Sequence, residues 1–147
     1  MPEAGGSSVK SARIVAGVDG SSCSKLALKW ASRQAELTGL PLSVVVAWEF
    51  PASYGWAPPW PADYDPKRDA KALVEDVVDE VLGSAARIGL STEVIQGNPA
   101  VALCEESKRA ELVVVGSRGH GEFAGMLLGS VSEFLVTHAH CPVVVVR

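Results

Sequence analysis

The sequence has little that would attach it to a membrane or to a nucleic acid. No apolar run reaches about 18 residues, the length that would predict a membrane-spanning helix. The formal net charge is -4 at pH 7, whereas a protein that binds DNA or RNA usually carries a basic face. We therefore expect no membrane and no nucleic acid among the partners of this chain.

Cysteine is also scarce, and its pattern predicts no disulfide framework. Cys23, Cys104 and Cys141 are odd in number and form no Cys-x-x-Cys motif. His138 and His140 lie near Cys141, but no second cluster of suitable spacing accompanies them, so we predict no zinc site. The N-terminus lacks the basic and then apolar pattern of a secretory signal. Free thiols without such a signal favour a cytoplasmic protein.

Short apolar runs alternate along the chain with segments of helical spacing. The predicted strands are 13–19, 42–50, 92–96, 111–116 and 142–146. The predicted helices are 23–37, 66–88, 98–109 and 130–138, with Gly89 as the stop signal of the second. Strands that are apolar on both faces and alternate with helices predict an α/β fold with a parallel sheet covered on both sides. Right-handed crossovers make it an open, doubly wound sheet of five strands, with the Rossmann-like or flavodoxin-like order 3-2-1-4-5.

Two segments lie outside this alternation. Residues 1–11 are rich in Gly, Ser and Ala and predict a flexible tail, so residues 12–147 are expected to form a single domain. Residues 51–65 hold several prolines together with Trp56 and Trp60, a composition that excludes a helix or an inner strand. We predict an aromatic and proline-rich loop insertion. It could close over a ligand, cover a partner surface or be disordered, and the sequence does not separate these alternatives.

The most informative motif follows the fourth predicted strand. Gly116 and Gly119 come at the end of that strand, and nine residues after Gly119 the pair Gly129 and Ser130 begins the last predicted helix. Glycines allow a backbone to come close to a ligand, and a helix N-terminus offers N–H donors and a partial positive charge. Ser130 is also a natural N-cap whose hydroxyl can donate to a phosphate. The motif therefore predicts a phosphate-binding loop.

Charged residues near this motif extend the predicted site. Asp19 ends the first predicted strand, which the predicted order places beside the strand that ends in Gly116. Ligands of such sheets bind beyond the carboxyl ends of the strands, at the point where the strand order reverses, so both residues are expected in one crevice. Arg118 is the one cation inside the motif, and phosphate contact and a solvated position are equally open for it. For His120 a surface position is favoured over phosphate contact.

These residues together resemble the universal stress protein family. The resemblance covers residues 13–147 and rests on Val-Asp-Gly-Ser at 18–21 and on the pattern G-x2-G-x9-G-[S/T], which this chain matches at every position. That pattern is typical of the ATP-binding branch of the family. The resemblance implies an ATP-binding, nucleotide-dependent sensor or regulator in the stress response, with Mg²⁺ beside the phosphates. No nucleophile is accompanied by a base and an orienting group, so at most slow ATP hydrolysis is expected.

The resemblance also implies which residues contact the nucleotide. Asp19 would line the adenosine end, Ala47 would offer a backbone contact to adenine, and residues 129–132 would hold phosphates through N–H groups and hydroxyls. The full predicted set is Gly17, Asp19, Ala47, Val115, Gly116, Arg118, Gly119, Gly129, Ser130, Val131 and Ser132. No catalytic or metal-binding side chain is predicted. Cyclic AMP or AMP in the same site is the first alternative to ATP, and a true nucleotide-dependent enzyme is the second.

The last predicted strand indicates how the chain assembles. Residues 143–146 are four valines and lie at an edge of the predicted sheet, and a bare apolar edge of this kind tends to find a partner. In the family this strand pairs with its copy in a second subunit. The resemblance therefore implies a homodimer through strand 142–146, whereas a regulatory protein partner cannot be named from the sequence.

Overall fold

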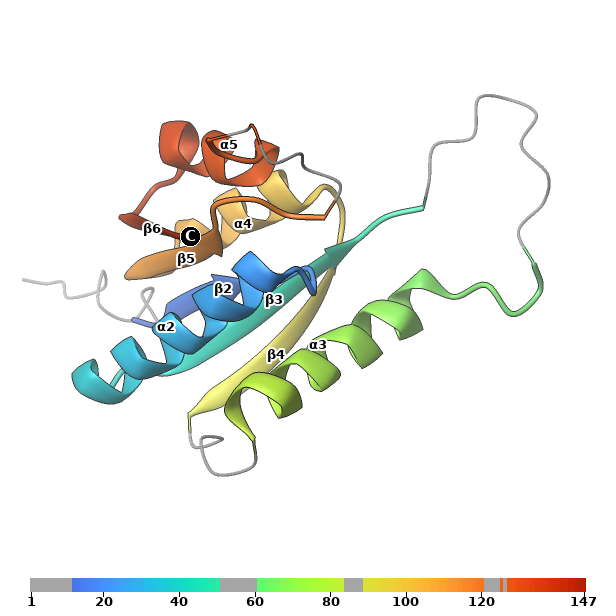
Figure 1. The fold of residues 1–147 in the computed structure, drawn as a ribbon, viewed down its shortest axis with the longest axis horizontal. Coiled ribbons are helices and arrows are strands. Elements are labelled where there is room, and N and C mark those ends of the chain that lie inside the picture. Colours follow the sequence, from blue (N-terminus) through green and yellow to red (C-terminus); the bar gives the residue numbers. More distant parts are fainter. Residues whose placement is uncertain (1–11, 51–60, 84–88, 121–124, 126) are drawn as a thin grey trace, which may run out of the picture.

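A computed structural model of the chain describes residues 12–50, 61–83, 89–120, 125 and 127–147. Helices and strands alternate along these residues (Figure 1). In chain order they are β2 (Ile14–Gly17), α2 (Ser22–Thr38), β3 (Leu42–Trp48), α3 (Pro66–Leu82), β4 (Leu90–Gln96), α4 (Pro99–Ser107), β5 (Leu112–Gly116), α5 (Ser130–His138) and β6 (Val143–Val146). The predicted flexible tail and most of the predicted loop insertion lie outside the described residues.

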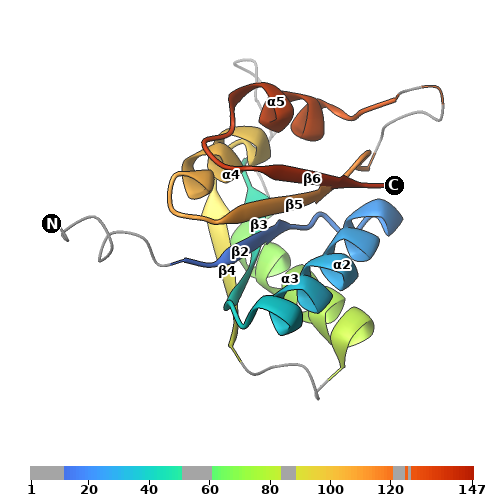
Figure 2. The same cartoon turned by 90° about the vertical axis from the view of Figure 1, so that its left-hand side faces the viewer.

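The sheet confirms the predicted fold class. Its strand order is β4-β3-β2-β5-β6, with every pairing parallel, and this is the order 3-2-1-4-5 expected from the sequence. The helices α2 and α3 cover one face, and α4 and α5 cover the other (Figure 2). The fold is thus a three-layer α/β arrangement of the Rossmann-like kind.

The register of the central strands brings their carboxyl ends together. Ile14 of β2 lies opposite Leu42 of β3 on one side and Leu112 of β5 on the other. Parallel strands run in one direction, so the ends of β2, β3 and β5 meet at the same edge of the sheet. The strand order reverses between β2 and β5, and ligands of such sheets bind at that point.

Alternating side chains of the strands build a core on each face of the sheet. Ile14 and Ala16 of β2 join the cluster beneath α2 and α3, which includes the fully buried Leu28. Val15, which points to the opposite face, joins the cluster beneath α4 and α5, where Leu135 is also fully buried. Both faces of the central strands are therefore apolar, as their sequence pattern predicted.

Side-chain caps fix the start of two helices at the carboxyl edge of the sheet. Ser21 accepts a hydrogen bond from the N–H of Ser24 at the start of α2, and Asn98 accepts from Ala100 and Val101 at the start of α4. Both helices therefore begin at fixed points beside the ends of β2 and β3. In the described part of the chain, no helix combines the length and the apolar character needed to cross a membrane.

Several predicted boundaries differ from the structure by one or two residues, and the end of α3 differs most. The helix expected to run to Gly89 ends at Leu82, because Gly83 adopts a left-handed conformation (φ 66°) that terminates α3. Strand β4 begins at Leu90, two residues before the predicted start at Thr92, and pairs with β3 along its whole length. Leu90 and Ser91 belong to the strand because they pair with Leu42 and Ser43 of β3, a backbone contact that the apolar pattern does not reveal.

Candidate functional site

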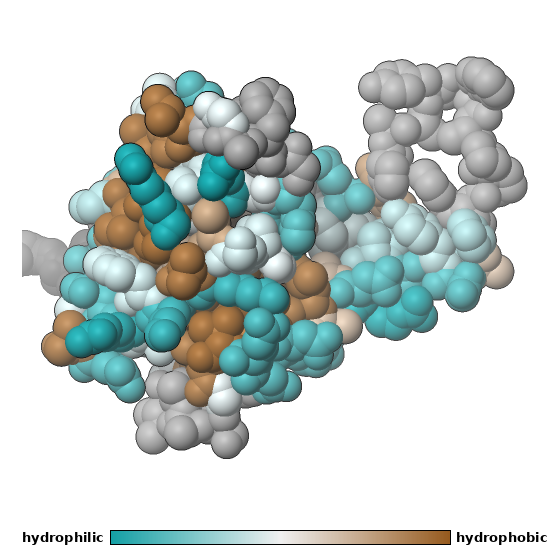
Figure 3. All heavy atoms as spheres, in the orientation of Figure 1, coloured by the Kyte–Doolittle hydropathy of each residue, from teal (hydrophilic) through white to brown (hydrophobic). Residues whose placement is uncertain are grey.

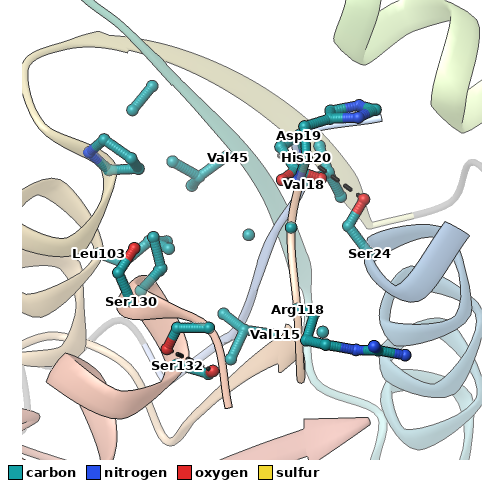
Figure 4. Close-up of a pocket in the computed structure, with 17 residues that line it drawn as sticks. Val18, Asp19, Ser24, Val45, Leu103, Val115, Arg118, His120, Ser130 and Ser132 are labelled. Atoms are coloured by element: carbon teal, nitrogen blue, oxygen red, sulfur yellow. Dashed lines mark hydrogen bonds between the residues drawn. The ribbon is translucent and has the colours of Figure 1, made fainter. Parts of the chain in front are cut away.

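A cavity of about 250 Å³ opens at the carboxyl edge of the sheet (Figure 4). This volume lies just below the range for small-molecule sites, which begins at roughly 300 Å³. The ends of β2, β3 and β5, the turn before α2 and the first turns of α4 and α5 contribute its lining. Every residue that the sequence predicted to contact a nucleotide lines this one cavity.

One end of the cavity is apolar. Val45 and Ala47 of β3, Pro99 and Leu103 of α4 and Val115 of β5 line it, and Figure 4 shows Val45 and Leu103 across the cavity from Asp19 and His120. Aliphatic side chains offer an apolar surface on which a flat aromatic ring can pack. This end can therefore hold a nucleobase by apolar contact.

Several of these lining residues were absent from the sequence prediction, which had named Ala47 but not Val45, Pro99 or Leu103. Val45 lies two positions before Ala47 on the same strand, so strand alternation alone would have placed it on the same face. Leu103 could be found only from the packing of α4 against β2. A Cβ atom at Gly17 would lie 2.6 Å from Leu103 Cδ1, which shows that the glycine makes room for this leucine.

The other end of the cavity is formed by the start of α5. The structure corrects the predicted cap: the N-cap is Gly129, which carries no side-chain cap, and Ser130 is the first helical residue. The reason is that the chain is already anchored one residue earlier, since the N–H of Gly129 donates to Ser117 O at 2.5 Å and its carbonyl accepts from Glu133. The N-terminus of a helix carries a partial positive charge, so an anion is favoured at this end.

The hydroxyl of Ser132 has a structural role that the sequence did not reveal. It lies 3.0 Å from Ser117 O and 3.1 Å from Gly129 O, and the residue is fully buried. Its single proton is shared between these two backbone carbonyls, so it ties the end of β5 to the start of α5. The predicted donation from this hydroxyl to a phosphate would require breaking those contacts.

The guanidinium of Arg118 does not point at the start of α5. Figure 4 shows its side chain running toward α2, away from Ser130 and Ser132, although the residue lines the cavity. Both alternatives for Arg118, phosphate contact and a solvated position, remain predictions. In this orientation the anion-favouring end of the cavity is lined by the first residues of α5.

Gly116 is needed for packing, and no glycine of the motif adopts a left-handed backbone angle. The left-handed glycines of the described residues are Gly20, Gly39, Gly83, Gly89 and Gly97, so no motif glycine is among them. At position 116, a Cβ atom would lie 2.7 Å from the carbonyl carbon of the α2 residue Cys23 and 2.9 Å from its oxygen. The first turn of α2 therefore packs directly on the end of β5.

Asp19 joins the turn before α2 to the loop after β5. Its Oδ1 accepts hydrogen bonds from the N–H of Ser21 at 2.9 Å and from the Ser21 hydroxyl at 2.5 Å. Its Oδ2 accepts from the N–H of His120 at 3.2 Å. His120 lines the cavity as well, and its Nε2 lies 3.3 Å from where a Cβ of Gly20 would be.

The ionised form of Asp19 is stabilised by these donors. Partial desolvation by its neighbours raises the pKa of Asp19. Hydrogen bonds from Ser21, Ser24 and His120 together lower the pKa by more than this, so the net pKa lies below the ordinary value. A carboxyl group whose pKa is lower in the folded than in the unfolded state stabilises the fold at neutral pH. That contribution is lost as the pH falls through the folded-state pKa.

We therefore expect Asp19→Asn to lower the free energy of unfolding at neutral pH and to lose this effect in acid. Urea unfolding of both proteins from about pH 7 to about pH 3, below the reference pKa of aspartate, would measure the difference. Asp76→Asn, at an exposed position of α3, is the matched control and should show no such trend. A difference between wild type and Asp19→Asn that stays constant with pH would contradict the assignment.

The described residues offer few ligands for a metal ion. Asp19 is the one carboxylate among the residues that line the cavity, and no group of three or more His, Cys, Asp or Glu side chains is positioned to hold a metal within the described ranges. Mg²⁺ usually keeps several waters and takes further ligands from one or two carboxylates and from phosphates. The site therefore fits Mg²⁺ only as a companion of bound phosphates.

Comparison with known proteins shows the family to which the chain is similar. The model of the universal stress protein family matches residues 10–147. Universal stress protein Rv2623 of Mycobacterium tuberculosis is 37% identical over 145 residues, an alignment that covers 91% of this chain and 47% of the relative. A universal stress protein of Mycolicibacterium smegmatis is 37% identical over 141 residues, with the same coverage. The chain thus spans about half the length of these curated relatives.

Solved structures share the fold. Universal stress protein UspA from Lactobacillus plantarum superimposes with a TM-score of 0.72 at 22% identity, covering 94% of this chain and 99% of that protein. A universal stress protein in complex with cAMP has a TM-score of 0.63 at 24% identity, covering 92% and 97%. The Archaeoglobus fulgidus universal stress protein in complex with dAMP has a TM-score of 0.61 at 18% identity, covering 92% and 98%.

Proposed function

The chain belongs to the universal stress protein family, and we propose that it binds an adenine nucleotide, ATP first, as a cytoplasmic sensor or regulator of the stress response. The observation that carries the proposal is the single cavity that collects every predicted contact residue, apolar at one end and bounded by the start of α5 at the other. Adenine would lie between Val45, Ala47 and Leu103. The phosphates would lie at residues 129–132, with Mg²⁺ held by phosphate oxygens and water.

A nucleotide with a single phosphate is the second candidate. The orientation of Arg118 leaves the phosphate end with backbone donors from one helix N-terminus, which suits one phosphate as well as three. The fold neighbours solved in complex with cAMP and dAMP support the same alternative. Cyclic AMP or AMP would then be the signal that the protein reports.

Calorimetric titration of the nucleotide-stripped protein would decide between these ligands. We expect saturable binding of Mg-ATP at one site per chain, and weaker binding of cyclic AMP and AMP. Tighter binding of cyclic AMP than of ATP would replace ATP as the principal ligand. No binding of any of the three, by a protein shown to be folded, would overturn the proposed function. Phosphate release from ATP, followed in the same samples, would detect the slow hydrolysis that the family resemblance allows.

We also propose that the protein is a homodimer through β6. This strand pairs with β5 on one side, and its four valines remain partly exposed. Figure 3 shows apolar side chains gathered along β6 and over α5, where Val136 is 57% exposed. An uncovered apolar strand edge is a natural site for pairing with a second copy.

A proline at position 145 is expected to convert the dimer into a monomer. The carbonyls of Pro142 and Val146 accept hydrogen bonds from β5, so by strand alternation the N–H of Val145 faces the open edge. Val145→Pro removes that edge donor while leaving the β5 ladder intact. Val145→Ala keeps the N–H and is the matched control. Sedimentation velocity would measure the oligomeric state of both variants. If Val145→Pro remains a dimer, this strand edge is not the interface.

A further inference from the structure

The glycine at position 119 lies directly against the carboxylate of Asp19. A Cβ atom at 119 would overlap Oδ2 of Asp19, and the one other described heavy atom near it, chain neighbours aside, is Cγ of the same aspartate at 3.6 Å. Gly119 is outside the set of described glycines with left-handed backbone angles. The structure therefore gives one reason for glycine at this position, which is room for the carboxylate.

Asp19 is itself held firmly by the sheet and by α2. The preceding N–H, of Val18, donates to Val45 O at 2.9 Å, and the N–H of Asp19 lies 3.3 Å from Ser24 Oγ. Oδ1 is held by two donors of Ser21. The carboxylate thus has a fixed place on the β2 side of the cavity, and Oδ2 remains to meet the loop that follows β5.

The loop after β5 comes to this fixed carboxylate through a backbone donor. The N–H of His120 donates to Asp19 Oδ2 at 3.2 Å, across a separation of 101 residues in the chain. A hydrogen bond to a charged acceptor is stronger than one between neutral groups, so this contact can set where the loop lies. Residues 116–120 carry the first half of the glycine motif, and their position decides the shape of the cavity.

We propose that Asp19 is a positioning residue, which holds the loop after β5 in place through the N–H of His120, and that position 119 is glycine to accommodate this carboxylate. This inference rests on the proposed function, since nucleotide affinity is its main readout. It differs from the expectation that Asp19 contacts the adenosine directly. It also differs from the usual explanation of such a glycine, which is close approach of the ligand.

A double-mutant cycle between positions 19 and 119 tests the proposal. Gly119→Ala and Asp19→Ala should each weaken Mg-ATP binding by roughly tenfold, the fold-change expected when a hydrogen bond to a charged group is lost. The double variant should bind about as well as Asp19→Ala alone, because the added methyl group then has no carboxylate to displace. Independent losses that multiply in the double variant would show that Gly119 serves the ligand, and would overturn the proposal.

A second pair of variants isolates the backbone donor. His120→Pro removes the N–H and His120→Ala keeps it, so the affinity difference between these two proteins measures the N–H itself. We expect His120→Pro to bind Mg-ATP less tightly than His120→Ala by a factor similar to the loss in Asp19→Ala. Equal affinities of the two proteins would contradict the role of this donor.

Denaturant unfolding of the four proteins of the 19–119 cycle separates failure of this proposal from failure of the proposed function. If wild type binds none of the adenine nucleotides, the proposed function fails. The free energies of unfolding of the four proteins still measure the coupling between Asp19 and Gly119. We expect the cost of Gly119→Ala to fall in the Asp19→Ala background. Additive costs in unfolding would overturn the positioning role whatever the ligand is.

Discussion

Glu106→Ala is expected to destabilise the protein by about 3–5 kcal/mol, the cost of breaking a buried ion pair by removing one partner. The Glu106 side chain is 8% exposed and forms an ion pair with Arg13, whose side chain is 17% exposed. Glu106 also accepts a hydrogen bond from Arg109 at 3.1 Å. Arg13 already has a buried Nε without a hydrogen-bond partner in the described structure. Loss of the Glu106 carboxylate would leave the guanidinium with the more exposed Glu93, 3.8 Å away, as its remaining counter-charge.

Urea unfolding would measure this effect, with Glu105→Ala as the matched control. Glu105 is the neighbouring residue, its side chain is 63% exposed and it pairs with Lys108 at the surface, so its removal should cost less than about 1 kcal/mol. Replacing both partners, in Arg13→Met with Glu106→Leu, should recover much of the stability lost in Glu106→Ala. A Glu106→Ala protein as stable as Glu105→Ala would contradict the buried pair.

Gly116→Ala is expected to weaken nucleotide binding at least tenfold and to lower stability by about 1–3 kcal/mol, the usual cost of overpacking. The added methyl group would lie within 3 Å of the carbonyl carbon, the oxygen and the Cβ of Cys23. Two of these atoms belong to the backbone, so a side-chain rotation cannot relieve the clash. The start of α2 or the end of β5 must move, and both border the cavity.

Calorimetry with Mg-ATP and urea unfolding would measure the two effects of Gly116→Ala. Gly39→Ala is the control, because Gly39 ends α2 in a left-handed conformation (φ 75°) with open space around it. Its substitution should cost about 1–2 kcal/mol of stability through backbone strain alone and leave nucleotide affinity unchanged. Gly116→Ala with normal affinity would show that the contact between α2 and β5 does not shape the site.

Much of the candidate site could be predicted from the sequence, because its residues follow strand ends. Asp19, Ala47 and Gly116 come directly after or late in apolar runs, and in a parallel sheet such positions share one edge. The residues that were missed, Val45 and Leu103 among them, look like ordinary core residues in the sequence. Their place at the cavity depends on which face of a strand or helix meets the opening, and local patterns do not carry that information.

The prediction for the start of α5 shows a different limit. A serine before an apolar helical segment is a common N-cap, and the sequence alone favoured Ser130 over Gly129 for that reason. The structure decided otherwise because Gly129 is held by Ser117, at the end of β5. A contact between the end of a strand and the start of a helix overrides a local capping preference when it anchors the chain one residue earlier.

The sequence by itself determined the alternation of strands and helices, the parallel sheet with its order and the edge at which the cavity lies, because hydrophobic periodicity and right-handed crossovers leave few other arrangements. Tertiary structure alone decided what the glycines make room for, where Arg118 points and that Arg13 pairs with Glu106, 93 residues away. These features depend on distances between segments that are far apart in the chain. Such distances are fixed only when the helices pack on the sheet.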